Sequence, residues 1–295
     1  MTHGNRTDSW DFEPGDEIVP GRTAVRRLGG GSRFEAYLAF DETLHSAVVA
    51  KVVRPDQVDD PRTLEALARE AEMATRLAHP SLVRAFATVP DGPRPHLVLE
   101  HLDGPRLSTL VRRYGPLPLE QALPLCLELC SVLHYLQAVD VVHLDVKPSN
   151  VVMGAPPRLI DLSIARSVGE AATLRQAIGT DAYMAPEQCD PTPETPVGPP
   201  ADVWGLGATM YAALTGRPPR RDRPEPLPRS VPPVLAGHVL SCLDPDPAAR
   251  PRPAELADRV EPLVAALPRP VLAGFLPKSR DRGRGRKNLV PVRRK

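Results

Sequence analysis

One short polar stretch, residues 142–152, constrains the fold of this chain more than any other. It reads Val-His-Leu-Asp-Val-Lys-Pro-Ser-Asn-Val-Val and places Asp145, Lys147 and Asn150 within six residues. Apolar residues stand at both ends, which is typical of a polar loop between a helix and a buried strand. A second acid, Asp161, closes another apolar run a few residues later. The fold must therefore hold a polar loop between buried elements.

These side chains suit phosphoryl transfer. One carboxylate can accept a proton, another can hold a metal ion, and an amide beside them can assist. The distribution of lysine supports this interpretation. Of 37 basic residues only five are lysine, and within residues 1–277 the two lysines are Lys51 and Lys147. Arginine does not replace lysine where a compact charge must fit beside a phosphate. We interpret both lysines as phosphate contacts, with chance placement as the alternative.

The composition favours a folded cytoplasmic protein. The chain has 295 residues, 42% of them hydrophobic, which is enough for one large core or two lobes. It has no apolar run of about 18 residues and no signal-peptide core, so we expect no transmembrane segment. Its four cysteines have no paired framework, which indicates a reducing compartment.

A glycine turn lies between two of the strands predicted at residues 23–28, 34–40 and 46–53. The turn is Gly29-Gly30-Gly31, and glycines there allow the backbone to approach a phosphate closely. Taken alone this signal is weak, because such a turn is usually only a hairpin. A helix is predicted over 62–78, followed by strands over 82–89 and 96–102 and by helices over 106–114, 118–138 and 254–266.

The motifs together resemble those of a known family. The pattern His-x-Asp-x-Lys-Pro-x-Asn within residues 143–150 resembles the catalytic loop of eukaryotic-type protein kinases. Leu28-Gly29-x-Gly31, followed by Tyr37 and Lys51, resembles their glycine-rich loop and third-strand lysine. The resemblance covers residues 20–266 and is strongest to the bacterial, actinobacterial-style serine/threonine kinases. It implies an α+β bilobal kinase-like fold, with a small antiparallel β-sheet lobe with one helix and a larger, mostly helical lobe.

The resemblance also implies a domain organisation. Residues 1–14 are expected to be a flexible leader, 15–101 the N-lobe and 102–268 the C-lobe. Residues 269–295 would be a disordered basic tail, because 278–295 contain nine Lys or Arg and a single Asp. Such a tail could contact nucleic acid or an anionic membrane surface, or it could only keep the protein soluble.

Catalytic roles follow from the resemblance, residue by residue. Asp145 would orient the acceptor hydroxyl and accept its proton, and Lys147 would stabilise the transferred phosphate. Asn150 and Asp161 would bind Mg²⁺, with Mn²⁺ as an alternative. Leu99 would gate the inner adenine pocket, and the hinge after it would bind adenine through backbone groups. The expected nucleotide contacts are Leu28, Gly29, Gly30, Gly31, Ala36, Val49, Lys51, Glu70, Leu99, Glu100, Leu102 and Asn150.

Several positions depart from the family pattern. Phe34 replaces the third glycine of the loop, and Ser163 replaces the glycine two residues after Asp161. Leu144 stands where many kinases have an arginine that pairs with a phosphate on the activation segment, so we expect a weak phosphorylation switch. Ala36 is smaller and Val49 larger than usual, which predicts an adenine pocket of compensated volume.

Further motifs predict the scaffold of the larger lobe. Asp202 would tie down the backbone of the catalytic loop, and Thr180 would contact that loop through its hydroxyl. Arg250 would pair with Glu187. Residues 219–234 are almost all proline, arginine or polar, where most of the family has an extra helix that helps to dock protein substrates.

The sequence therefore predicts an enzyme that transfers the γ-phosphate of ATP to Ser or Thr hydroxyls of proteins. The alternative is a pseudokinase, a nucleotide-binding scaffold that signals by shape. The altered loop positions favour the scaffold, whereas the complete set of six charged and amide side chains favours the enzyme.

Overall fold

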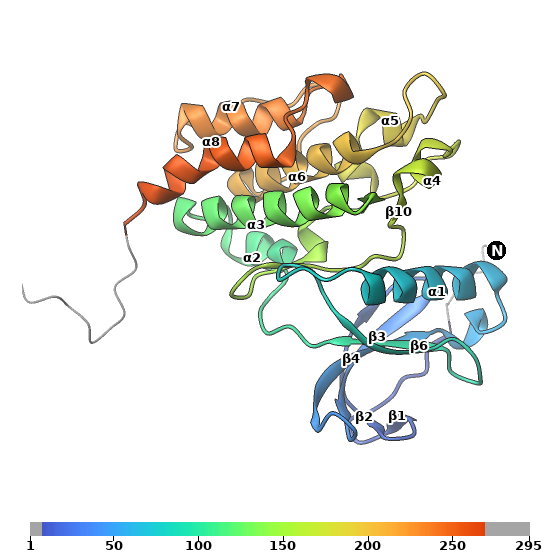
Figure 1. Ribbon diagram of the computed structural model, residues 1–295. Helices are drawn as coiled ribbons and strands as arrows, with labels where there is room; N and C mark the ends of the chain where they lie inside the picture. Colours follow the sequence, from blue (N-terminus) through green and yellow to red (C-terminus); the bar gives the residue numbers. More distant parts are fainter. Residues whose placement is uncertain (1–7, 269–295) are drawn as a thin grey trace, which may run out of the picture.

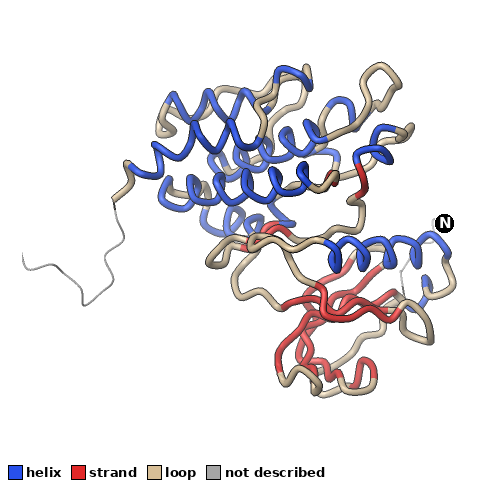
Figure 2. Tube along the Cα trace, viewed as in Figure 1, coloured by secondary structure: helices blue, strands red, loops and turns tan. Residues whose placement is uncertain are grey.

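Strands and helices separate into two lobes in the computed structural model, which describes residues 8–268 (Figure 1). Figure 2 shows the main sheet together in one lobe beside a single long helix, whereas most of the helices gather in the other. This arrangement confirms the predicted α+β bilobal fold.

The smaller lobe is a curled antiparallel sheet with strand order β1-β2-β3-β4-β6-β5 and one long helix, α1. Sequential strands pair across short turns, except that α1 and β5 are inserted between β4 and β6. The elements are β1 (Glu17–Val19), β2 (Arg22–Gly30), β3 (Phe34–Asp41), β4 (Ser46–Val53), α1 (Pro61–Arg76), β5 (Ala85–Val89) and β6 (His96–Glu100).

Strand alternation gives this sheet two different faces. Successive side chains on a strand point to opposite sides, and Ala36, opposite Lys51 in the β3–β4 register, lies on the face with Val49 and Leu99. The opposite face is a separate apolar cluster. It consists of Ile18, Ala24, Tyr37, Ala39, Val48, Ala50, Val52 and Val98.

The chain before β1 covers this second cluster. Trp10 and Phe12 pack against it, the ring of Phe12 lies edge-on to Tyr37 at 5.3 Å, and the indole N–H of Trp10 donates to the carbonyl of Val53 at 2.8 Å. The hydroxyl of Ser9 donates to the buried carboxylate of Glu35 at 2.6 Å. The prediction of a flexible leader through residue 14 is thus wrong for residues 8–14, because two aromatic side chains complete the small lobe's core.

The larger lobe is built around α6, which is buried on nearly all sides. Its N-terminal half packs closely on the catalytic loop, because a Cβ atom at Gly205 would lie only 3.0 Å from Val146. The elements of this lobe are α2 (Leu107–Tyr114), α3 (Leu119–Ala138), β7 (Val141–Val142), β8 (Val151–Val152), β9 (Arg158–Leu159), β10 (Arg166–Ser167), α4 (Val168–Ala172), α5 (Pro186–Cys189), α6 (Pro199–Thr215), α7 (Pro233–Cys242) and α8 (Pro253–Ala265).

Most predicted boundaries differ from the observed ones by only a few residues. The strand predicted from Leu82 begins at Ala85, because Leu82 instead forms an isolated parallel bridge with Leu159 of the other lobe. The strand predicted to reach Leu102 ends at Glu100. As predicted from composition, the described chain has no helix between the end of α6 and the start of α7 at Pro233.

Two further predictions concern transmembrane segments and the basic tail. Among the residues that the structure describes, none of the helices has the length and apolar character needed to cross a bilayer. The basic tail, residues 269–295, lies outside the described residues, and so do residues 1–7.

Replacing Trp10 by alanine tests whether the N-terminal segment belongs to the folded lobe. We expect Trp10→Ala to lower the free energy of unfolding by roughly 2 kcal/mol, since the packed indole and its hydrogen bond are lost. Thermal or urea unfolding measures the change. The control is Phe86→Ala, because Phe86 is 49% exposed and surface substitutions usually change stability by about 0.5 kcal/mol or less. Equal stability of the two variants would restore the flexible-leader interpretation.

Candidate active site

The ammonium group of Lys51 joins the two lobes. It extends from β4 and donates to Glu70 Oε2 of α1 at 2.5 Å and to Asp161 Oδ1, after β9, at 3.2 Å. Glu70 is almost fully buried, and the side chain of Lys51 is 15% exposed. The structure therefore brings these three predicted residues together.

The groups of this cluster shift one another's pKa, but at Glu70 burial outweighs the charge of Lys51 and raises the pKa of the carboxyl group. Burial alone would lower the pKa of Lys51, but the carboxylates of Glu70 and Asp161 outweigh it and raise that pKa above its usual value. Burial would raise the pKa of Asp161, but the charge of Lys51 and hydrogen bonds to Ser163 and Lys51 hold it well below its usual range. Lys51 and Asp161 are therefore both ionised at neutral pH.

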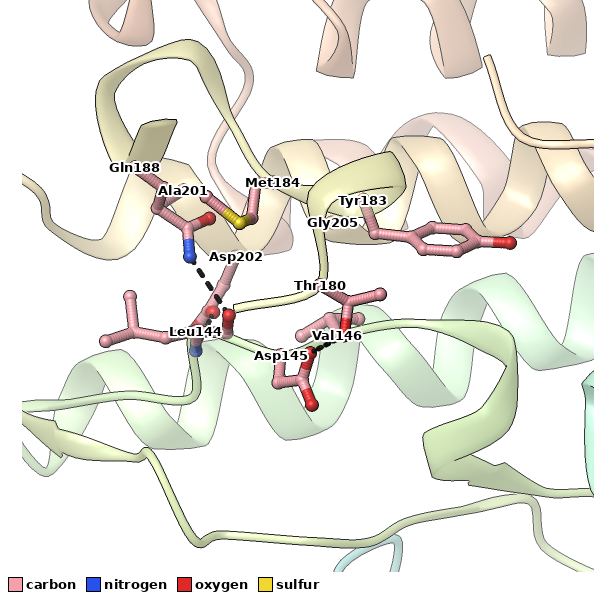
Figure 3. A pocket seen from close by; sticks show the side chains of 10 residues that line it. All are labelled: Leu144, Asp145, Val146, Thr180, Tyr183, Met184, Gln188, Ala201, Asp202 and Gly205. Carbon is pink, nitrogen blue, oxygen red and sulfur yellow. Dashed lines mark hydrogen bonds between the residues drawn. The ribbon is translucent and has the colours of Figure 1, made fainter. Parts of the chain in front are cut away.

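The catalytic loop places Asp145 at the centre of a hydrogen-bonded group. Its Oδ2 accepts from Lys147 Nζ at 2.6 Å and from Asn150 Nδ2 at 2.9 Å, and its Oδ1 accepts from the hydroxyl of Thr180 at 2.8 Å. Lys147 Nζ also lies 2.5 Å from that hydroxyl. Figure 3 shows Thr180 reaching Asp145 from the activation segment, as predicted for this threonine.

The backbone of this loop is fixed from α6. Both oxygens of Asp202 accept backbone N–H groups at 2.7 Å, one from His143 and one from Leu144. Leu144 has a positive φ of 66°, a conformation that an apolar residue seldom adopts without outside support. The carboxylate of Asp202 supplies that support, and it confirms the predicted tie between α6 and the loop.

A second predicted pair stabilises the lobe at a distance from the cavity. The guanidinium group of Arg250 makes a bidentate pair with Glu187, at 2.6 and 2.8 Å, and both side chains are buried. The indole of Trp204 lies against the guanidinium, 5.1 Å from its ring. Buried charges persist only when they are paired, and this pair anchors the end of the activation segment.

A cavity of about 730 Å³ lies between the lobes, within the size range of ligand sites. The glycine turn, Lys51, Asp161 and the connection between the lobes all contribute to its wall. Among the residues that line it are all of the predicted nucleotide contacts: Leu28, Gly29, Gly30, Gly31, Ala36, Val49, Lys51, Glu70, Leu99, Glu100, Leu102 and Asn150.

The cavity wall also contains residues that the sequence analysis missed. Val83, Val152 and Ile160 line it as apolar side chains, and Arg106 and Thr109 lie at its edge towards α2. The three apolar residues stand within predicted strands or beside catalytic motifs, but strand periodicity does not tell which face meets a ligand. Arg106 and Thr109 carry no motif at all.

The glycine turn has a buried support that no sequence motif indicated. Glu35 follows the turn in β3, is fully buried, and pairs with Arg54 at 2.9 Å. Arg54 in turn donates from Nε to the carbonyl of Gly31 at 2.6 Å. The position of the turn therefore depends on an ion pair whose partners are 19 residues apart.

Phe34 contacts the lysine of the cluster. Its ring centroid lies 4.9 Å from Lys51 Nζ, at a distance suited to a cation–π interaction. The replacement of the third loop glycine by Phe34 was evident from the sequence, but its contact with the ammonium group was not.

Oxygen atoms suited to a divalent ion face this region. Asn150 turns its amide nitrogen to Asp145, and among the described residues its Oδ1 accepts no hydrogen bond. Asp161 supplies a carboxylate to the same cavity. Magnesium and calcium prefer such oxygen ligands, so the two predicted metal ligands fit the role that the resemblance implies.

Comparison with known proteins decides the family. Residues 22–257 match the family model described as the protein kinase domain. The chain belongs to the protein kinase family.

Relatives of this kinase domain include named bacterial enzymes. It is 36% identical over 201 residues to the serine/threonine-protein kinase PknB of Mycobacterium leprae, which is 65% of this chain and 32% of that protein. It is 34% identical over 263 residues to the probable serine/threonine-protein kinase PkwA of Thermomonospora curvata, which is 83% of this chain and 34% of that protein. The chain spans about a third of the length of these curated relatives. These findings confirm the resemblance to bacterial serine/threonine kinases.

The predicted volume compensation in the adenine pocket can be tested by a double-mutant cycle. Ala36 and Val49 lie diagonally on neighbouring strands, on the face that lines the cavity. We expect Val49→Ala and Ala36→Val each to weaken ATP binding, and the double variant to recover a large part of the loss. Calorimetric titration with a nonhydrolysable ATP analogue measures the affinities. Strict additivity of the two single effects would contradict shared packing on one ligand.

Proposed function

We propose that this kinase domain transfers the γ-phosphate of ATP to Ser or Thr hydroxyl groups of proteins. The observation that carries the proposal is the convergence of Lys51, Asp145 and Asp161 on one region between the lobes. Lys51 donates a hydrogen bond to Asp161, and both residues line the cavity between the lobes. Asn150 lines the same cavity and donates to Asp145.

Each predicted residue then has a role in transfer. Lys51, held by Glu70, would bind the α and β phosphates as a compact charge. Asp145 would orient the acceptor hydroxyl and accept its proton, since its carboxylate lies at the centre of the loop's hydrogen bonds. Lys147, 2.6 Å from that carboxylate, would stabilise the transferred phosphate. These assignments are supported by the geometry and by the family to which the domain belongs.

Nucleotide and metal binding are part of the same proposal. The backbone of the hinge would contact adenine, because the carboxylate of Glu100 is engaged with Arg158 at 3.2 Å. Asn150 and Asp161 would hold Mg²⁺, or Mn²⁺ as the alternative, and the bound ion would neutralise charge on the phosphates. The four cysteines lie among the described residues and are free, which supports a reducing compartment such as the cytoplasm.

The pseudokinase alternative rests on the altered positions Phe34, Leu144 and Ser163. None of them removes a group that transfer requires: Phe34 packs against the lysine, Leu144 is held by Asp202, and Asp161 remains ionised beside Ser163. The observed arrangement thus favours the enzyme over the scaffold. Contacts of the basic tail with nucleic acid or membrane remain a prediction.

A transfer assay separates the enzyme from the scaffold. Purified protein is incubated with radiolabelled ATP, magnesium and a general acceptor protein, beside Asp145→Asn and Lys51→Met. We expect label transfer by the wild type and a loss of about a hundredfold or more in both variants, because proton acceptance or phosphate positioning is removed. Glu65→Gln, at an exposed acid of α1, is the control and should behave as wild type.

Binding data complete the comparison. Asp145→Asn should still bind ATP, because Asp145 does not line the nucleotide cavity. Equal background transfer in all proteins, together with measurable ATP binding by the wild type, would support the scaffold and overturn the proposed enzyme.

Phosphorylation of the activation segment should have little effect on this activity. Thr173, the candidate phosphorylation site of this segment, is exposed directly after α4 and donates to the carbonyl of Glu170. Leu144 offers no charge to a phosphate at this position. We expect Thr173→Ala, and wild type after phosphatase treatment, to keep initial rates within about twofold of the untreated enzyme. A tenfold fall in either case would contradict this expectation.

A further inference from the structure

A buried side chain that the transfer mechanism does not use lies between the catalytic loop and the activation segment. Gln188, on α5, is 2% exposed. Figure 3 shows its amide directed at the backbone of Leu144, with Met184 and Asp202 close by. A buried amide requires partners for both its oxygen and its nitrogen, so its bonds show what it holds together.

The amide of Gln188 has partners in three segments. Its nitrogen donates to the carbonyl of Leu144 at 3.0 Å and to the carbonyl of Ile178 at 3.0 Å. Its oxygen accepts from the backbone N–H of Ala185 at 3.2 Å. The bond to Ala185 only caps the start of α5, whereas the two donated bonds reach outside the helix.

The two carbonyls stand next to the reacting centre. Leu144 directly precedes Asp145, and Ile178 lies two residues before Thr180, whose hydroxyl donates to Asp145 Oδ1 at 2.8 Å. One amide thus fixes the backbone on both sides of the Thr180–Asp145 contact. A small displacement of either segment would lengthen that contact and move the carboxylate that faces the acceptor hydroxyl.

The packing at Gly179 leaves no room for a side chain. A Cβ atom on Gly179, which has a φ of 131°, would lie 3.0 Å from the carbonyl oxygen of Leu144 and 3.3 Å from Gln188 Nε2. Only a glycine fits between the two segments in this backbone conformation. The three groups are therefore in direct contact, and the link depends on the donors of Gln188.

The link is neutral. Leu144 is 3% exposed and apolar, so it cannot join the segments through a charge. Two hydrogen bonds join the uncharged amide to backbone carbonyls, and they need no added phosphate. They do not depend on whether hydroxyl groups of the activation segment are phosphorylated.

We propose that Gln188 is a positioning residue, which holds the activation segment against the catalytic loop in the transfer-competent arrangement without phosphorylation. The inference rests on the proposed function for its effect on rate, but the contact itself can be tested separately. It assigns a role in the reaction to a residue outside the nucleotide cavity.

Gln188→Glu is the discriminating variant. Glutamate has nearly the same shape and keeps the oxygen that caps α5, but its carboxylate cannot donate to Leu144 or Ile178. Gln188→Met, which removes donors and acceptor together, is the second variant. Gln121→Met is the matched control, because Gln121 is exposed on α3.

We expect both Gln188 variants to lower kcat by about ten- to a hundredfold at saturating acceptor, with the KM for ATP within about threefold of wild type. Melting temperature and binding of an ATP analogue are measured on the same preparations. Wild-type kcat in Gln188→Glu would overturn the proposal, since the cap alone would then suffice. A fall in kcat matched by an equal loss of ATP binding would also overturn it.

Limited proteolysis tests the contact without any activity. Trypsin can cut the activation segment after Arg175, which is exposed. We expect cleavage there to be at least about fivefold faster in Gln188→Glu than in wild type or Gln121→Met, because the segment is released. If wild type transfers no phosphate, the proposed function fails, and this comparison still decides whether Gln188 holds the segment. Equal cleavage rates would overturn that role.

Discussion

The structure depends on one ammonium group placed between two carboxylates. Lys51 belongs to the sheet, Glu70 to the helix beside it, and Asp161 to the other lobe. Because the side chains of Lys51 and Glu70 are largely withdrawn from water, the ammonium group of Lys51 is stable there only while it is paired with the carboxylates. The cluster therefore fixes the position of α1 against the sheet and of the sheet lobe against the helical lobe. The width of the cavity between the lobes follows from these two relations.

A second set of contacts fixes the position of the catalytic loop, mainly through the loop's backbone groups. Asp202 accepts two N–H groups from the loop, and Gln188 donates to one of its carbonyls. Thr180 then reaches Asp145 from the activation segment. In this arrangement hydrogen bonds from the uncharged side chains of Gln188 and Thr180 join the segment to the loop, beside the contact of Lys147 with the Thr180 hydroxyl. The loss of an arginine at position 144 is thus accompanied by a different connection, and it does not leave the loop without support.

Much of the site could be predicted because catalytic motifs are local in sequence. Asp145, Lys147 and Asn150 lie within six residues, and the scarcity of lysine made Lys51 conspicuous. The supports of these residues were harder to foresee. Glu35 and Arg54 form a buried pair under the glycine turn, but each alone reads as an ordinary surface charge. The packing of Trp10 on the sheet was missed for a similar reason, since a polar leader with two aromatic residues has no periodic pattern.

The sequence by itself determined the family and the positions of most strands of the smaller lobe and of the long helices α1, α2, α3 and α8, and it predicted which groups would face a nucleotide. These follow from local spacing and from alternation along strands, which a linear chain displays directly. Only the tertiary structure decided that Val83, Val152 and Ile160 also line the cavity, that residues 8–14 complete the small lobe's core, and that one amide joins three segments. Such contacts unite residues far apart along the chain, such as Leu144 and Gln188, and their free energy arises only when burial brings the partners together and excludes water.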